Sequence, residues 1–131
     1  MVEVAVCFPV FLMILLGIIE FGRAMSVNQL LNSAARMGCR AAILDGSTNT
    51  TVTNTVKQQV SNLVGCSQSD VTVAIAVTDG ATGTAIANLS GAGTGDVIKI
   101  DVSVPFSSVS WSVAKYLRTR SVRGECAMQH E

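Results

Sequence analysis

The first 44 residues carry two hydrophobic patterns in succession. Residues 4–19 are uncharged and apolar throughout, directly after the acidic Glu3. Further along, apolar residues recur at every third or fourth position, which is typical of an amphipathic helix; they stand at positions 27, 31, 34, 35, 38 and 42. Gly46 can end the helix, because glycine readily adopts the left-handed conformation of a helix C-terminus. The pattern predicts one helix over residues 2–44, about 65 Å long, apolar all round in its first half and on one face in its second.

The apolar run is long enough to enter a bilayer, since about sixteen helical residues span about 24 Å. Only Glu3 precedes it as a charge, and no small-residue cleavage site follows it. A cleaved secretory signal would have a basic start and such a site. The segment is therefore expected to stay in lipid, or in a core built by many copies of the chain. A plain retained signal anchor is the alternative.

Pro9 interrupts this first half. Proline removes one backbone hydrogen bond and clashes with the preceding turn. We expect a kink or a locally unwound segment over residues 7–11. Alternatively, residues 1–8 are a first turn or a frayed end.

The remaining residues predict a small α+β domain. Ser47 and Thr48 can cap a second helix with its core over residues 52–64, which ends at Gly65. Alternation predicts three strands, and the Gly-, Thr- and Ala-rich segment between the first two is expected to be a loop. The strands cover residues 71–78, 97–104 and about 118–128, and the loop covers 81–95. The expected fold is a long hydrophobic helix, a second helix, and a three-stranded antiparallel sheet packed on the upper half of the long helix.

This pattern divides the chain in two. Residues 1–24 form a hydrophobic transmembrane or filament-core half of the helix, and residues 25–131 form the globular domain together with the amphipathic half. About 105 residues are enough for one small domain and no more.

Charge and chemistry exclude several function classes. Nine basic and nine acidic residues give zero formal net charge, so a nucleic-acid partner is not expected. The single histidine, His130, is next to the last residue, which argues against a catalytic triad. The aspartates lack the spacing of a calcium loop. We therefore predict no catalytic residue, no cofactor and no metal site.

Four cysteines, at positions 7, 39, 66 and 126, match neither a zinc site nor a Cys-x-x-Cys pair. Cys7 lies in the apolar run, so at most one bond can form within the chain among the other three. If the strands run up, down and up beside the helix, Cys126 comes close to the helix end that carries Cys39. The pair Cys39–Cys126 is favoured, and Cys66–Cys126 is the alternative.

Several motifs in order along the chain resemble a known family. The start Val2-Glu3-Val4-Ala5, an early proline, and above all Gly17-Ile18-Ile19-Glu20-Phe21-Gly22-Arg23 look like the N-terminus of TadE-like pilins, the pseudopilin-type subunits of tight-adherence (type IVc) pilus systems. Residues 32–42 are similar to the family's Ala-Arg-x-Gly-x-Arg stretch. Residues 102–111 and 126–131 show a weaker similarity to the same family. The resemblance implies a type IV pilin-like fold.

Two features depart from the family pattern. Family members carry a basic leader that a prepilin peptidase removes, and a glutamate about five residues into the mature chain. Here the glutamate is Glu3 and no leader is present, so we expect the sequence to be close to the processed form. The C-terminal Gln129-His130 stands where relatives often have two arginines.

The resemblance also implies roles for particular residues. Glu3 would pair with the N-terminal ammonium of an adjacent subunit and fix the axial register; the alternative is a carboxylate at headgroup level with no structural role. Glu20 and Arg23 are three residues apart and can pair along one helix face. They either mark the membrane surface or bridge subunits. The predicted assembly residues are thus Glu3, Pro9, Glu20 and Arg23.

The function that follows is structural. The chain is expected to be a bacterial pilin that is held in the inner membrane as a precursor, processed by a prepilin peptidase and passed to the pilus assembly machinery. It would then form an extracellular helical homopolymer, used for adhesion. The alternative is a minor TadE-like pseudopilin or a membrane-anchored periplasmic assembly or binding module that does not form the bulk of a fibre.

Overall fold

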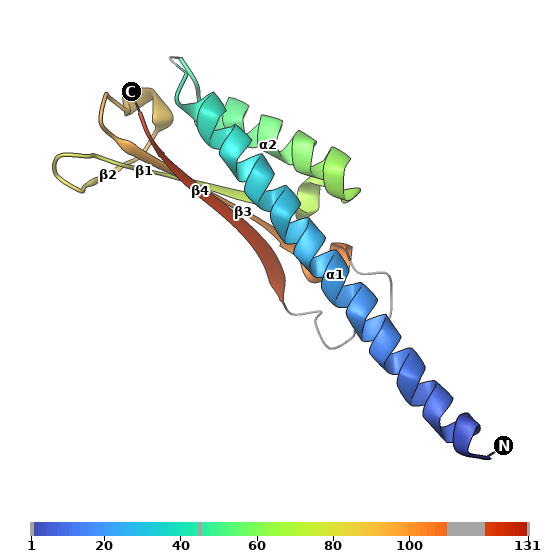
Figure 1. Cartoon of the computed structure of the whole chain (residues 1–131). Coiled ribbons are helices and arrows are strands. Elements are labelled where there is room, and N and C mark those ends of the chain that lie inside the picture. Colours follow the sequence, from blue (N-terminus) through green and yellow to red (C-terminus); the bar gives the residue numbers. More distant parts are fainter. Residues whose placement is uncertain (1, 45, 110–119, 131) are drawn as a thin grey trace.

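The protein folds into a long helix, a second helix and one antiparallel sheet. The computed structural model describes residues 2–44, 46–109 and 120–130, apart from the side chains of residues 2, 3 and 5. The helices are α1 (Val2–Ala42) and α2 (Asn49–Val64). The strands are β1 (Thr72–Thr78), β2 (Ala85–Ile86), β3 (Val97–Pro105) and β4 (Ser121–Gln129), with the short 3-10 helices η1 (Gln68–Asp70), η2 (Leu89–Gly91) and η3 (Phe106–Ser108). Figure 1 shows the N-terminal half of α1 projecting from the rest of the molecule.

The predicted long helix is confirmed. α1 has 41 residues, which makes it about 60 Å long. It is helical through Pro9, so the expected unwinding over residues 7–11 is wrong. Proline removes a single backbone hydrogen bond, and the bonds of the turns on both sides hold the helix together. At the other end, the Ser47 hydroxyl donates a 2.6 Å hydrogen bond to the carbonyl of Ala41.

Both predicted ends of α2 are confirmed. The Thr48 hydroxyl accepts the N–H of Thr51 at 3.3 Å and caps the first turn. Gly65 stops the helix in the left-handed conformation, at φ 76°, and its N–H bonds to the Ser61 carbonyl. One face of α2 is buried, formed by Val52, Val56 and Val60.

The sheet has four strands in the order β2-β1-β3-β4, all antiparallel. The three predicted strands are present, and the fourth, β2, lies in the segment expected to be a loop. Two residues suffice for it because Asp79 accepts the N–H groups of Ala81 and Thr82, which turns the chain back so that Ile86 pairs with Val77. β4 begins at Ser121; residues 118 and 119, where the prediction began, lie outside the described residues.

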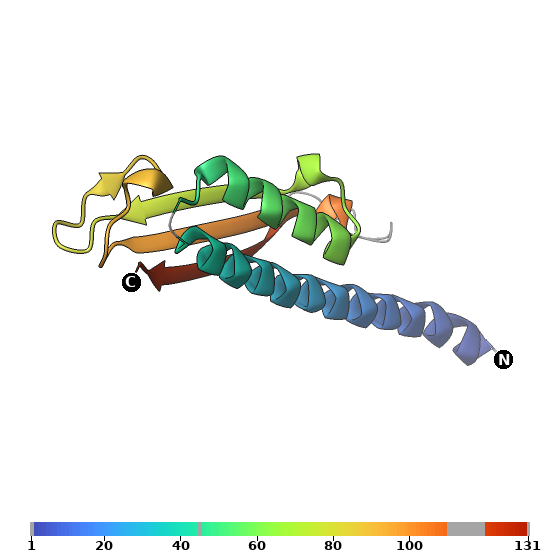
Figure 2. The same ribbon diagram turned by 90° about the horizontal axis from the view of Figure 1, so that it is seen from above.

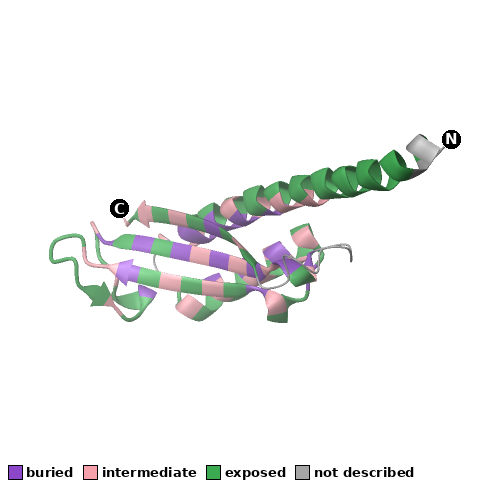
Figure 3. Cartoon of the chain, turned by 90° about the horizontal axis from the view of Figure 1, so that it is seen from below, coloured by how far each residue is buried: buried purple, intermediate pink, exposed green. Residues whose placement is uncertain are grey.

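Both helices cover the same face of the sheet (Figures 1 and 2). α1 packs mainly on β4 and β3, whereas α2 lies beside α1 and reaches β1. Burial alternates along the central strands, as the banding in Figure 3 shows. The core therefore lies between the upper half of α1, the valine face of α2 and one face of the sheet.

Two glycines let these layers approach closely. A Cβ on Gly38 of α1 would lie 2.6 Å from Cγ2 of Val56 in α2. A Cβ on Gly124 of β4 would lie 2.4 Å from the main-chain carbon of Leu31. Gly38 belongs to the Ala-Arg-x-Gly-x-Arg stretch, so this motif has a packing role: its glycine is the contact point of the two helices.

Candidate assembly surface on the N-terminal helix

The lower half of α1 has an apolar surface that is exposed at its described side chains. Every described side chain from residue 4 to residue 19 is exposed. The large ones include Val4, Phe8, Phe11, Met13, Ile14, Ile18 and Ile19. Among the described side chains of α1, burial first occurs at Val27, and Figure 3 shows the change along the helix. A contiguous apolar surface of this size marks a membrane or protein interface.

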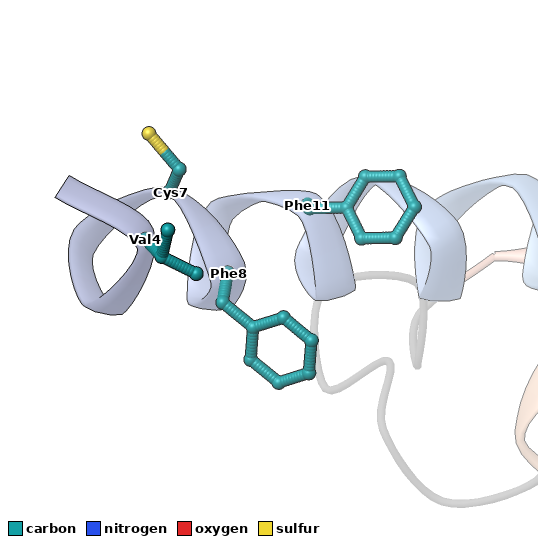
Figure 4. A pocket seen from close by; sticks show the side chains of 4 residues that line it. All are labelled: Val4, Cys7, Phe8 and Phe11. Atoms are coloured by element: carbon teal, nitrogen blue, oxygen red, sulfur yellow. The ribbon is translucent and has the colours of Figure 1, made fainter. Parts of the chain in front are cut away.

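By length and composition α1 is able to cross a membrane, and no residue of its most apolar stretch is buried inside the protein. The surface itself is uneven. Val4, Cys7, Phe8 and Phe11 line a shallow apolar depression in which the Cys7 thiol and the Phe8 ring point away from each other (Figure 4). These side chains offer no ionisable or amide group except the thiol. The depression thus has the character of a packing surface and not of a catalytic pocket.

Gly17 and Gly22 lie in the projecting half, and their lack of a side chain makes room for no contact with the described part of the chain. A Cβ on either would meet nothing within 4 Å. Glycine in a helix interior is less favourable than alanine by about 1 kcal/mol. The contrast with Gly38, where the space is filled by α2, separates glycines with an internal packing role from glycines without one.

Arg23 fastens the globular domain to α1 at the upper edge of the apolar surface. Its Nε donates a hydrogen bond to the carbonyl of Val109, directly after η3. The ion pairs among the described residues join Lys99 to Asp101 and Glu125, and none joins Glu20 to Arg23. Pairing of these two along the helix face is therefore not found in the described part of the chain. A carbonyl from another segment provides an acceptor for Arg23 that helical spacing alone does not reveal.

Glu20 has an unusual environment for a carboxylate. Its side chain is half-buried, and its Oε2 atom is enclosed without a hydrogen-bond partner in the described part of the chain. A carboxylate oxygen removed from water in this way destabilises the isolated subunit. Glu20 stands where the apolar surface ends and the contacts with the globular domain begin.

The other predicted assembly residues are spread along the same helix. Pro9 is exposed in the projecting half, and Glu3 belongs to the first turn of α1 with a side chain outside the described atoms. From Glu3 to Arg23 the helix rises about 30 Å. The structure does not gather these residues into one cluster within a subunit, so any joint role has to involve neighbouring molecules.

The cysteines divide into one close pair and two separate thiols. Sγ of Cys39 lies 3.4 Å from the carbonyl oxygen of Cys126, and all four cysteines are free thiols. Cys66 is buried after the end of α2, where its carbonyl accepts a hydrogen bond from the Ser61 hydroxyl. Cys7 is exposed on the projecting helix.

Two further acidic residues, Asp79 and Asp96, have structural roles. The two carboxylate oxygens of Asp96 accept the N–H groups of Gly80 and Gly93, so that Asp96 joins the β1–β2 turn to the start of β3. The N–H bonds that Asp79 accepts hold the pKa of its exposed carboxyl below the usual value. Across the described residues, no three side chains of His, Cys, Asp or Glu are grouped in a way that could hold a metal ion.

Sequence reasoning missed two polar contacts that fasten the layers together. Asn32 of α1 accepts the N–H of Glu125 at 3.1 Å, on the open edge of β4. Asn49, in the first turn of α2, accepts the N–H of Leu89 at 2.9 Å. No sequence signal indicates either of these contacts, so only the tertiary structure reveals them.

Comparison with known proteins adds one match. No curated protein and no solved structure matches the chain. The family model described as TadE-like protein matches residues 1–40, which include the apolar run, the Gly-Ile-Ile-Glu-Phe-Gly-Arg block and Gly38. The resemblance to TadE-like proteins is thus confirmed over these residues, and it is joined here to a pilin-like α+β architecture. The match covers 40 of the 131 residues, so the chain is similar to TadE-like proteins over its N-terminal helix.

Proposed function

We propose that the chain is a structural pilin subunit, which assembles through the apolar half of α1 into an extracellular Tad-like type IV pilus. The observation that carries this proposal is the exposure of every described side chain from residue 4 to residue 19. An apolar surface of this extent has to be covered by something outside the chain. In the proposal, lipid covers it first and copies of the same helix cover it afterwards.

Because lipid covers the helix first and other subunits cover it later, the proposal places the subunit first in the membrane and then in the fibre. As a precursor it resides in the inner membrane, with the apolar half of α1 in the bilayer and the globular domain outside the cytoplasm. After processing by a prepilin peptidase, the Tad machinery packs copies head to tail. Such a heterologous contact repeats without closing and generates a helical homopolymer. Adhesion is the use that the family resemblance suggests for it.

The glycines of the projecting half support helix-to-helix packing. Helices in an apolar environment gain little from hydrophobic burial, because lipid is as apolar as the partner helix. Close approach at small residues supplies the attraction instead. Gly17 and Gly22 give a neighbouring helix this access, since no atom of the described residues lies within 4 Å of an added Cβ.

The two glutamates of α1 would find partners in the assembly. An ionised carboxylate in an apolar core costs several kcal/mol unless it is paired. We assign to Glu3 the N-terminal ammonium of an adjacent subunit, which neutralises both charges and sets the axial register. We assign to Glu20, whose Oε2 atom is enclosed without a partner, a cationic or N–H donor group from a neighbouring subunit.

A second candidate function is a minor TadE-like pseudopilin or a membrane-anchored periplasmic module. The family match favours it to the extent that residues 1–40 are the part that an anchor and a pilin would share. Continuity of α1 far beyond the apolar run favours assembly, since a simple anchor needs no rigid link between membrane and domain.

Purified surface fibres distinguish the two candidates. Appendages are sheared from cells, viewed by electron microscopy and identified by mass spectrometry of their main band. A structural pilin is the main band, and cells that produce only the Glu3→Ala variant have no fibres while the variant accumulates in the inner membrane. Gln58→Ala, on the exposed face of α2, is the matched control and leaves the fibre yield unchanged. A main band without this chain contradicts the proposal and supports the minor or anchor role.

A further inference from the structure

Two thiols that are 87 residues apart in sequence meet inside the globular domain. Cys39 of α1 is fully buried, and its Sγ lies 3.4 Å from the carbonyl oxygen of Cys126 and 4.0 Å from that of Ile98. The Cys126 side chain is also close enough to the Cys39 thiol to raise its pKa, after the larger effect of burial. Each thiol is therefore the other's neighbour across the interface of α1 and β4.

The surrounding structure fixes this neighbourhood. Cys126 is two residues after Gly124, so both face the helix layer, because side chains alternate along a strand. Gly124 lies against the backbone of Leu31, and the Asn32 side chain accepts the N–H of Glu125. These contacts at residues 124 and 125 determine the distance and register of β4 relative to α1 directly before Cys126.

The other two cysteines lie elsewhere. Cys66 follows α2 on the β1 side of the sheet, and β3 separates β1 from β4, a span of about 9.6 Å between strand axes. Cys7 is about 48 Å below Cys39 along α1. A disulfide needs Cα atoms about 4.4 to 6.8 Å apart. The alternative pair Cys66–Cys126 is therefore disfavoured by the fold.

We propose that Cys39 and Cys126 form a disulfide when the globular domain reaches an oxidising compartment, and that the bond fastens the last strand to the long helix. The proposal depends on an extracytoplasmic location of the domain and not on filament assembly. The oxidant is a protein of the thiol–disulfide oxidoreductase class that carries a reactive disulfide. Fibres whose subunits lack the disulfide would contradict this proposal and leave the proposed function intact. A disulfide in a chain that forms no fibres would do the reverse.

The exchange proceeds in two steps. The Cys126 thiolate attacks one sulfur of the oxidant's disulfide, forms a mixed disulfide and releases the other sulfur as a thiolate. The Cys39 thiolate then attacks Sγ of Cys126 and expels the oxidant's second thiolate. The chain loses two thiol protons and two electrons, and the oxidant's disulfide becomes two thiols.

The order of attack follows from exposure. Cys126 is half-buried at the interface, whereas burial, and after it the neighbouring Cys126, raises the pKa of the Cys39 thiol to about 12. Folded Cys39 thus has almost no thiolate at neutral pH. The second step is fastest before α1 and β4 have closed, so the bond forms during folding and only slowly in the reduced native protein.

Peptide mapping tests the bond in the full chain. Free thiols are alkylated as cells are lysed, and the membrane and surface fractions are digested with trypsin without reduction. Cleavage after Arg36, Arg40 and Arg123 separates Cys39 (residues 37–40) from Cys126 (residues 124–131). We expect these two peptides joined, with Cys7 and Cys66 alkylated. Alkylated Cys39 and Cys126, or a bond from either to Cys66, overturns the proposal.

Stability provides a second readout. Reduction of the wild-type protein is expected to lower Tm by about 10 °C or more, because the bond closes a long loop. The Cys66→Ser control keeps this response to reductant, and the Cys39→Ser/Cys126→Ser double variant loses it. If the double variant does not fold, the response of the wild type alone decides. Equal Tm with and without reductant contradicts a stabilising bond.

Discussion

Gly124 of β4 lies against the backbone of Leu31 in α1, so close that a Cβ at position 124 would stand 2.4 Å from the main-chain carbon of Leu31. Neither partner can move out of the way alone. Leu31 lies inside a 41-residue helix, several turns from its end, and Gly124 is paired with Val102 in the adjacent strand. This contact sets the separation of the helix and sheet layers.

The first prediction concerns this contact. Gly124→Ala is expected to lower the free energy of unfolding of the globular domain by about 3 kcal/mol, because the added methyl group overlaps main-chain atoms that cannot rotate away. Chemical denaturation followed by circular dichroism measures the loss. Gly93→Ala is the matched control, since an added Cβ there meets nothing within 4 Å, and it is expected to change stability by less than about 0.5 kcal/mol. Equal stability of the two variants would refute the assigned role of Gly124.

A second prediction separates a steric effect from helix propensity at Gly38. Gly38→Ala improves the intrinsic helix propensity by about 1 kcal/mol, yet its methyl group would lie 2.6 Å from Cγ2 of Val56 and 3.3 Å from Cδ1 of Ile100. We expect a net loss of about 1 to 2 kcal/mol. In the Val56→Ala background, the same change is expected to be neutral or to stabilise by up to about 1 kcal/mol.

This double-mutant cycle is measured by urea denaturation of the four proteins. If Gly38→Ala still lowers stability in the Val56→Ala background, the added methyl group clashes with a residue other than Val56. If Gly38→Ala raises stability in the wild-type background, α1 and α2 are more loosely packed than the structure shows.

Local signals in the sequence predicted most of the fold. The cap at Thr48, the left-handed stop at Gly65 and the alternation of β3 depend on residues close together in the chain. Nonlocal pairing was harder to predict. β2 consists of two residues whose strand geometry depends on the partner Val77, so no period of its own marks it.

The assembly residues illustrate the same limit. Helical spacing indicated that Glu20 and Arg23 share one face, but spacing cannot reveal an acceptor from a distant segment such as the Val109 carbonyl. Proline at position 9 predicted local unwinding because the rule describes one missing bond and ignores the cooperative turns on either side. Strand direction brings β4 back along the helix, so that Cys39 Sγ lies 3.4 Å from the Cys126 carbonyl oxygen; the predicted bond between the two thiols stays a prediction.

A third prediction tests the glycines of the projecting helix. Gly17→Leu is expected to leave the circular dichroism and Tm of the detergent-solubilised subunit unchanged, since nothing in the described ranges of the chain is within 4 Å of an added Cβ. It is expected to reduce fibre yield at least tenfold, because a bulky side chain keeps neighbouring helices apart. Leu16→Met, at the adjacent exposed position, conserves volume and keeps the normal yield. Normal fibres from Gly17→Leu would exclude a close helix contact at this residue.

The fourth prediction concerns Glu20, whose Oε2 atom is enclosed without a hydrogen-bond partner in the described part of the chain. Glu20→Gln removes the charge at nearly constant shape. In the isolated subunit this relieves an unpaired carboxylate, so Tm is expected to stay the same or to rise. In the fibre it removes the partner of a donor group from the neighbouring subunit, so the yield is expected to fall at least tenfold.

The opposite directions of these two effects make the test specific. Glu20→Asp keeps the charge and serves as the control, with a smaller loss of fibres than Glu20→Gln. A residue that only supports the subunit's own fold would lower Tm and fibre yield together, and a residue that only marks the membrane surface would change neither. An unchanged or higher Tm with loss of fibres is therefore the combination that assigns Glu20 to the contact between subunits.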